Sequence, residues 1–189
     1  MAWWDDLWLN EAFASWMAWT VMEDVYPQFE SNLMLTQENA FPSDQGTSSK
    51  AIRKPVRTEK DALTGAGLNY TKGNALLRMI ERYVGKETWQ RAIRAYIKEH
   101  AWGNTTESDL WDAVSAESGL DVNAIASDFL NQPGFATVII DESGQVTQQR
   151  YLTEGREAAD LAWQIPLNVK YKADDQVKQT FLLLQKDGG

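Results

Sequence analysis

One acidic side chain inside an apolar stretch is the first candidate for chemistry. Glu11 lies within residues 6–26, which are rich in apolar residues and contain no Gly or Pro before Pro27. This pattern predicts a helix that is apolar nearly all round and therefore buried. An ionised carboxylate is costly there unless it is paired, hydrogen-bonded or bound to a metal ion. Glu11 has no cation beside it on the helix, so either a metal ion or a structural partner from elsewhere, such as an arginine, is expected.

A tyrosine and a histidine are the other candidates. Tyr70 opens the segment Tyr70-Thr71-Lys72-Gly73, where we expect a helix to start. A phenol at a helix start can donate a hydrogen bond to an oxyanion, although packing is the alternative role. His100 is the only histidine and falls at the end of an expected helix, where its charge would offset the helix dipole. One histidine cannot supply a two-histidine metal site, and residues 65–67 lack the pattern of a phosphate-binding loop.

The charge of the chain is unevenly distributed. The net charge is −9, yet the first 49 residues carry eight acidic side chains and no Lys or Arg, while the rest carries 19 acidic and 18 basic residues. The acidic segment argues against nucleic acid and anionic membranes as partners. It suits a cationic ligand such as a protonated amine, or simply a solvated face that aids solubility. The absence of Cys excludes disulfides and thiolate chemistry.

Five predicted helices would position these residues. Residues 38–67 separate the first helix from the others and are rich in Pro, Ser, Thr, Gly and Lys, so we expect a long surface loop with a short extended piece at 52–56. The later helices are predicted over 71–84 and 87–100, after a capping box at Thr106–Asp109, and from Asp121 to the Pro133-Gly134 pair that ends the last one.

The pattern changes to strands after Gly134. Pro166 limits its strand to a sheet edge or a bulge, and a turn is expected at 142–144. Helices followed by strands predict an α+β fold with one unit at 1–134 and a second at 135–189. An abrupt start on an apolar helix and so few strands lead us to expect a piece of a longer protein. The strands are predicted over 135–140, 145–152, 161–171 and 176–185.

Four motifs, in the same order along the chain, resemble those of the M1 (gluzincin) zinc aminopeptidases, which include aminopeptidase N. They cover residues 1 to about 140, and the strands that follow are similar to the start of that family's β-sandwich domain. The motifs are Trp3–Ala14, which resembles WWNDLWLNEGFA; Tyr70–Gly73, which resembles YEKG; Trp102–Thr106 with Asp109–Trp111; and Phe129–Gly134.

The resemblance implies a fold and a function. Residues 1–134 would be the mainly helical C-terminal half of a thermolysin-like catalytic domain, and residues 135–189 the start of an antiparallel β-sandwich. Glu11 aligns with the third zinc ligand, and Tyr70 aligns with the tyrosine that hydrogen-bonds the tetrahedral intermediate. The chemistry implied is metal-assisted attack of water on the first bond of a peptide with a free N-terminus.

The chain also departs from the family pattern. It contains no HExxH motif, so the two histidine ligands and the general-base Glu are absent, as is the GAMEN-type strand that helps to hold the substrate's amine. Catalytic zinc takes three protein ligands, so we expect this chain not to hold Zn²⁺ or hydrolyse peptides by itself. Smaller departures are Asp5 for Asn, Ala12 for Gly, and Ala136 where Pro is common.

Two other roles remain open at this stage. Five of the nine tryptophans fall within the first twenty residues, so the chain could be a non-catalytic, Trp-rich module that binds peptides or carbohydrates. That reading expects several of these tryptophans to be exposed, whereas the enzyme reading expects most to be buried. A third expectation is self-association into a dimer or larger assembly through apolar surface left uncovered. The five tryptophans are Trp3, Trp4, Trp8, Trp16 and Trp19.

Overall fold

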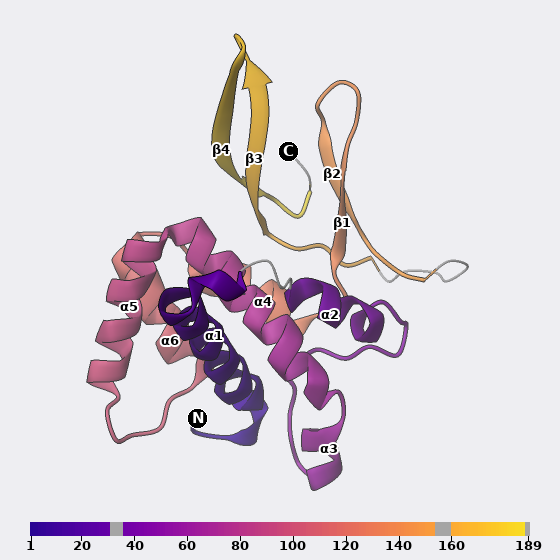
Figure 1. Cartoon of the computed structure of the whole chain (residues 1–189). Coiled ribbons are helices and arrows are strands. Elements are labelled where there is room, and N and C mark those ends of the chain that lie inside the picture. Colours follow the sequence, from indigo (N-terminus) through magenta and orange to yellow (C-terminus); the bar gives the residue numbers. More distant parts are fainter. Residues whose placement is uncertain (31–35, 154–159, 188–189) are drawn as a thin grey trace.

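A computed structural model describes residues 1–30, 36–153 and 160–187 of the chain. The helices gather on one side and two β-hairpins project from them, which confirms an α+β fold (Figure 1). In chain order the elements are η1 (Trp4–Asp6), α1 (Leu7–Val25), η2 (Pro27–Phe29), α2 (Thr36–Asp44), α3 (Glu59–Leu63), α4 (Ala66–Val84), α5 (Lys86–Glu99), α6 (Glu107–Ser118), α7 (Val122–Asn131), β1 (Ala136–Ile140), β2 (Val146–Arg150), β3 (Ile165–Ala173) and β4 (Gln176–Leu184).

Tryptophans dominate the core between the helices. Trp8 of α1 stacks on Trp111 of α6 with ring centroids 6.0 Å apart, and Trp16 of α1 meets Trp89 of α5 edge to face at 5.6 Å. All four rings are buried. Large aromatic rings contribute more buried apolar area than any other side chain, so these contacts tie α1, α5 and α6 together. The tryptophan content of the sequence is in part a core-packing feature.

The helix ends that the sequence indicates are mostly confirmed. The carboxylate of Asp109 accepts hydrogen bonds from the backbone N–H and the hydroxyl of Thr106, at 2.7 and 2.9 Å, which completes the capping box of α6. The Asp121 carboxylate caps α7 by accepting from the N–H of Ala124 at 3.1 Å. Such caps satisfy N–H groups that have no partner within the helix.

The prediction of a long loop over residues 38–67 is wrong. Helix α3 and all but the first two residues of α2 lie within it, and residues 51–57 between them form neither helix nor strand. Helix α2 packs against α4 and buries Ala40, although Pro42 lies inside it. Tertiary packing thus outweighs a composition rich in loop formers. Helix α3 instead has a local cause, a capping box between Thr58 and Asp61.

Helix α1 is less buried than its sequence predicts. Its N-terminal half contributes Trp8, Leu9, Ala12 and Trp16 to the core, but Val21 and Val25 near its end are about half exposed. Of the five N-terminal tryptophans, Trp8 and Trp16 are buried, Trp19 is half-buried, and Trp3 and Trp4 are exposed. The tryptophan pattern therefore matches neither of the two expectations fully.

The strands pair as two antiparallel hairpins. Ala136 of β1 lies opposite Arg150 of β2, and Ile165 of β3 lies opposite Leu184 of β4. Strand β3 begins four residues later than predicted. The side chain of Gln148 joins the hairpins by donating to the carbonyls of Trp163 and Gln185, at 2.7 and 3.0 Å. Because β1–β2 and β3–β4 are separate two-stranded sheets among the described residues, their assignment to a β-sandwich stays a prediction.

Ion pairs explain much of the acidic N-terminal segment. Three of its carboxylates pair with cations from later in the chain: Asp6 with Arg53 at 2.8 Å, Glu23 with Arg78 at 2.9 Å, and Asp44 with Lys72 at 2.9 Å. The expectation of a merely solvated acidic face is therefore wrong for these residues.

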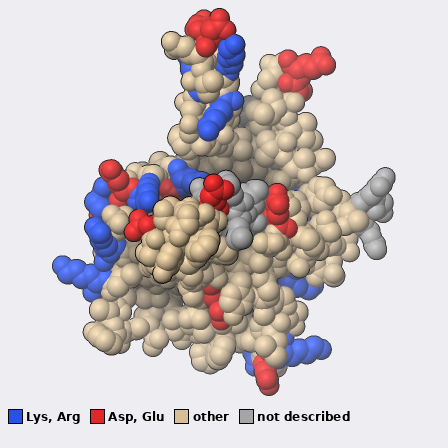
Figure 2. Space-filling view, viewed as in Figure 1, with Lys and Arg blue, Asp and Glu red and all other residues tan. Residues whose placement is uncertain are grey.

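Elsewhere, charges of both signs meet at the tip of the β3–β4 hairpin, where Lys172 pairs with Asp175 (Figure 2). In the part of the chain that the structure describes, no helix has the length and apolar character to cross a membrane.

The capping box of α6 gives a first testable prediction. Hydrogen bonds from Thr106 lower the pKa of Asp109, so its contribution to stability is full above the ordinary carboxyl pKa of 3.8 and is lost as the pH falls through the lower folded-state value. Asp109→Asn should lower the free energy of unfolding by about 1 kcal/mol at pH 7. Urea denaturation at pH 7 and at pH 2.5 (about one unit below 3.8) measures this.

The difference between the two proteins should shrink at the lower pH, because protonation of Asp109 removes the charged acceptor that stabilises the cap. A difference that is absent at pH 7, or undiminished at the lower pH, would contradict the role of Asp109.

Candidate metal and oxyanion site

The structure brings Glu11 and Tyr70 together across the α1–α4 contact. Hydrogen bonding to Glu11 is the largest cause of a raised Tyr70 pKa, followed by burial and by the negative charge of Glu11. The Tyr70 side chain is 45% exposed and Glu11 is half-buried, so both are accessible from outside. Two candidates 59 positions apart in the sequence thus share one surface site.

A glycine sets the distance between the two helices. A Cβ atom at Gly73 would lie only 2.6 Å from the Cβ of Ala12 and 3.4 Å from the Trp8 ring, so α1 and α4 touch backbone to side chain at this point. Gly73 is three residues from Tyr70, and Ala12 is next to Glu11. When the two helices pack at Gly73 and Ala12, Tyr70 and Glu11 lie along the same edge of the contact. The phenol therefore lies beside the carboxylate.

Further along, polar contacts continue between the same two helices. The indole N–H of Trp16 donates to the Glu81 carboxylate at 2.8 Å, and Arg78 forms its ion pair with Glu23. These bonds fix the relative rotation of α1 and α4 beyond the Gly73 contact.

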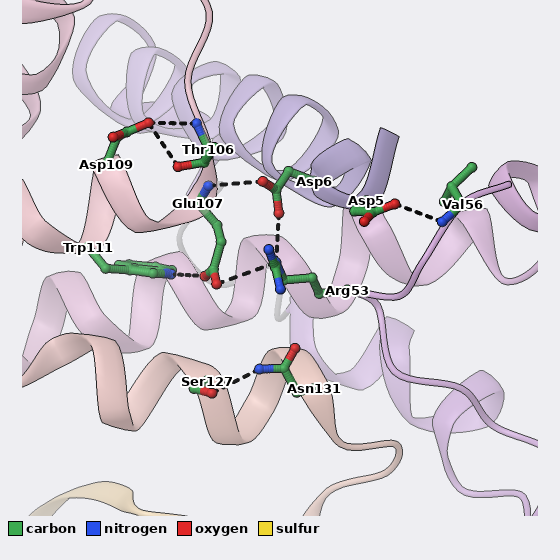
Figure 3. Close-up of polar contacts among 10 residues, drawn as sticks. All are labelled: Asp5, Asp6, Arg53, Val56, Thr106, Glu107, Asp109, Trp111, Ser127 and Asn131. Carbon is green, nitrogen blue, oxygen red and sulfur yellow. Dashed lines mark hydrogen bonds and ion pairs between the residues drawn. The ribbon is translucent and has the colours of Figure 1, made fainter. Parts of the chain in front are cut away.

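A buried charge network anchors the start of α1 (Figure 3). Asp6 is 4% exposed; its two oxygens bind Nε of Arg53 at 2.8 Å and the backbone N–H of Glu107 at 3.1 Å. The Glu107 carboxylate lies 3.4 Å from the same Arg53 nitrogen and accepts from the Trp111 indole. Burial raises the pKa of Glu107, partly offset by Arg53, whereas Asp6 raises the pKa of Arg53 against the effect of burial. The network holds α1, the loop at Arg53 and the start of α6 in one arrangement.

The prediction from the sequence places Tyr70 at the wrong point of its helix. Helix α4 begins at Ala66 rather than Thr71, so Tyr70 lies in its second turn and not at a helix start. The backbone N–H groups expected to help bind an oxyanion are therefore used inside the helix, and only the phenol can serve. Gly65, with φ of +73°, is the N-cap residue of α4.

Glu11 and His100, the two other candidates, have different surroundings. The Glu11 carboxylate forms no ion pair with a basic side chain within residues 1–30, 36–153 and 160–187, and it raises the pKa of the Tyr70 phenol. His100 lies at the C-terminal end of α5, as expected, with its ring 5.4 Å from the Tyr96 ring.

The residues present do not make a complete zinc site. Among the described residues, no three His, Cys, Asp or Glu side chains are grouped so as to hold a metal ion. Glu11 offers one carboxylate, whereas catalytic zinc takes three protein ligands, and the sequence has one histidine in all. Glu11, which is accessible and has no ion-pair partner among the described residues, fits one position of such a ligand set, and no second ligand is grouped with it in that part of the chain.

Other site-shaping residues are not evident from the sequence. Lys72 is 7% exposed, and its place on the apolar stripe between Leu68 and Leu76 is the one signal that marks it as buried. Nothing in the sequence indicates that its partner is Asp44, 28 residues earlier, or that Arg53 pairs with Asp6. These pairings depend on how the loops fold over the helices.

Comparison with known proteins identifies the family. The model of the peptidase family M1 domain matches residues 1–129. Aminopeptidase 2 of Candida albicans is 37% identical over 97% of this chain and 21% of its own length, and Aminopeptidase N of Lactococcus lactis subsp. lactis is 31% identical over 90% and 21%. Tricorn protease-interacting factor F2 of Thermoplasma volcanium is 34% identical over 89% and 22%. The chain belongs to peptidase family M1, and it spans about a fifth of the length of these curated relatives.

The Gly73 contact gives a second prediction. Gly73→Ala should lower the free energy of unfolding by about 1–3 kcal/mol, because the added methyl group overlaps Ala12. The double variant Gly73→Ala with Ala12→Gly moves the methyl group to the other helix and leaves the summed helix propensity unchanged. It should recover most of the loss in urea denaturation. Equal losses for the single and double variants would show that the close approach is not what the glycine provides.

Proposed function

We propose that this chain forms part of the active site of a zinc aminopeptidase that releases N-terminal residues from peptides. Glu11 would be the carboxylate ligand of the zinc ion, and Tyr70 the oxyanion-binding phenol. The observation that carries the proposal is that Glu11 and Tyr70, from two separate family motifs, flank the close approach of α1 to α4 at Ala12 and Gly73, and both are accessible there. Membership of a family of zinc-dependent peptidases supports it.

Tyr70 contributes through its single O–H donor. Attack on a peptide carbonyl places negative charge on the carbonyl oxygen, and a positioned phenol stabilises that charge by donating a hydrogen bond. A phenol has one proton to donate, so Tyr70 would have to direct it at the oxyanion rather than at the Glu11 carboxylate. Its 45% exposure leaves it free to do so.

We further propose that the chain by itself neither binds zinc tightly nor hydrolyses peptides. One carboxylate competes poorly with water for a metal ion, and a complete site needs histidine ligands that the single His100 cannot supply. Activity would therefore require a second polypeptide segment that carries an HExxH motif.

The alternative is a non-catalytic module that binds peptides or carbohydrates through its tryptophans. Trp3 and Trp4 are 63% and 49% exposed, which supports it, whereas the burial of Trp8 and Trp16 leaves a small platform. Binding of peptides or oligosaccharides that is unaffected by Glu11→Gln and Tyr70→Phe, and is lost in a Trp3→Ala, Trp4→Ala variant, would favour this alternative.

The test of zinc binding uses a chimaera. In it, residues 1–189 replace the aligned stretch of the Candida albicans Aminopeptidase 2, so that the relative supplies the rest of the site. We predict that the chimaera binds one zinc ion and hydrolyses amino-acid nitroanilides. The 189-residue chain should do neither. Glu11→Gln should weaken zinc binding by at least about 100-fold, because it removes a ligand. Glu38→Gln, which changes another carboxylate of the acidic segment, is the control and should bind as the parent does. Zinc binding by the short chain that Glu11→Gln abolishes would contradict the claim that its site is incomplete.

Tyr70 has its own prediction in the same chimaera. Tyr70→Phe should lower kcat by about 10²–10³-fold and leave the zinc content unchanged, since the phenol stabilises the transition state without binding the metal. Tyr83→Phe, on the same helix, is the control. A loss confined to KM, or no loss, would remove Tyr70 from the proposed reaction.

A further inference from the structure

A buried lysine joins α4 to the junction between the helices and the hairpins. The Nζ atom of Lys72 pairs with Asp44 at 2.9 Å and donates to the carbonyls of Gln132 and Gly134, at 3.1 and 2.9 Å. An ammonium group has three donors, so all three are used. Burial lowers the pKa of Lys72, and Asp44 opposes this effect.

Asp44 closes the same cluster from the other side. It is 1% exposed, and its second carboxylate oxygen accepts from the backbone N–H of Gly134 at 2.8 Å and from the hydroxyl of Ser49. Gly134 has φ of +85°, which strains any other residue, and a Cβ there would lie 2.6 Å from Nε of Arg150, so the Arg150 side chain would also have to move. The cluster thus fixes the end of α2, the middle of α4 and the turn before β1 with respect to one another.

The cluster and the Glu11–Tyr70 pair lie on nearly opposite sides of α4. Residues two positions apart on an α-helix are separated by about 200° around its axis and by about 3 Å along it. Lys72 and Tyr70 therefore point away from each other. Toward its C-terminal end, α4 is held against α1 by the Trp16–Glu81 and Arg78–Glu23 contacts, six and more residues beyond Lys72. Near Tyr70, the saturated charge cluster on the far side of α4 resists rotation of the helix.

We propose that Lys72 is a positioning residue for Tyr70. Its bonds to Asp44 and to the Gln132–Gly134 turn set the rotation of α4, and this rotation directs the phenol toward α1 at the Gly73–Ala12 contact, beside Glu11. The role of Lys72 in catalysis rests on the proposed function of Tyr70. Its role in positioning the Tyr70 side chain does not. The consequence is that the first hairpin, which begins two residues after Gly134, is mechanically linked to the site.

The test observes Tyr70 directly in the full 189-residue chain. The chain is labelled with 3-fluorotyrosine, and the Tyr70 resonance in the ¹⁹F spectrum is assigned by its loss in Tyr70→Phe. Glu11→Gln defines the resonance position when the carboxylate contact is changed. We expect Lys72→Met to move the Tyr70 resonance away from the parent position by at least as much as Glu11→Gln does.

Arg91→Met is the matched control, because it removes a paired cation of α5, whose partner is Glu117, and leaves the cluster and the α1–α4 contacts intact. It should leave the Tyr70 resonance in place. A folded Lys72→Met chain with an unmoved Tyr70 resonance would overturn the proposal and leave Lys72 a purely structural role.

A second variant covers the case in which Lys72→Met does not fold because Asp44 is left buried without a partner. Lys72→Met with Asp44→Asn removes both charges and avoids that penalty. The same two outcomes decide: a moved resonance supports positioning, and an unmoved one overturns it. Neither zinc nor hydrolysis enters this experiment, so it stands or fails separately from the activity of the chimaera.

Discussion

The approach of α1 to α4 at Gly73 and Ala12 is the contact on which the site depends. It leaves no space for even one added methyl group, and the Glu11 and Tyr70 side chains lie at its edge. Close helix contact through small residues allows little variation in distance, because interiors pack at the density of organic crystals. The conformation of two surface side chains is in this way determined by the packing beneath them.

Electrostatic anchoring holds that contact in place at both ends. Asp6, Arg53 and Glu107 connect the start of α1 to α6, while Asp44 and Lys72 connect α4 to the turn before the hairpins. Buried ion pairs contribute little net stability but strongly disfavour alternative arrangements in which one charge loses its partner. The acidic N-terminal segment is best understood in these terms. Several of its carboxylates serve as internal anchors, and Glu11, accessible and without a cation among the described residues, differs from them.

The sequence predicts much of this fold because the signals are local. The capping residues Thr106 and Asp121, the turn at Asp141–Gly144 and the four strands follow from side-chain chemistry within a few positions. Helix α2, the early start of α4 and the partial exposure of α1 were not predictable in this way, because each depends on tertiary packing. The same holds for the site: motifs identify Glu11 and Tyr70, but only the structure relates them to Gly73, Lys72 and Asp44.

The central claim is that Glu11 and Tyr70 are two parts of a zinc site whose remaining ligands come from outside these 189 residues. The most direct test is a crystal structure of the zinc-loaded chimaera, with diffraction data collected on both sides of the zinc absorption edge. Our account predicts one zinc ion, located by its anomalous peak and bound by a Glu11 oxygen and two histidines. The Tyr70 phenol should lie close to the open coordination position. A zinc peak bound without Glu11, or with Tyr70 turned away on a rotated α4, would contradict it.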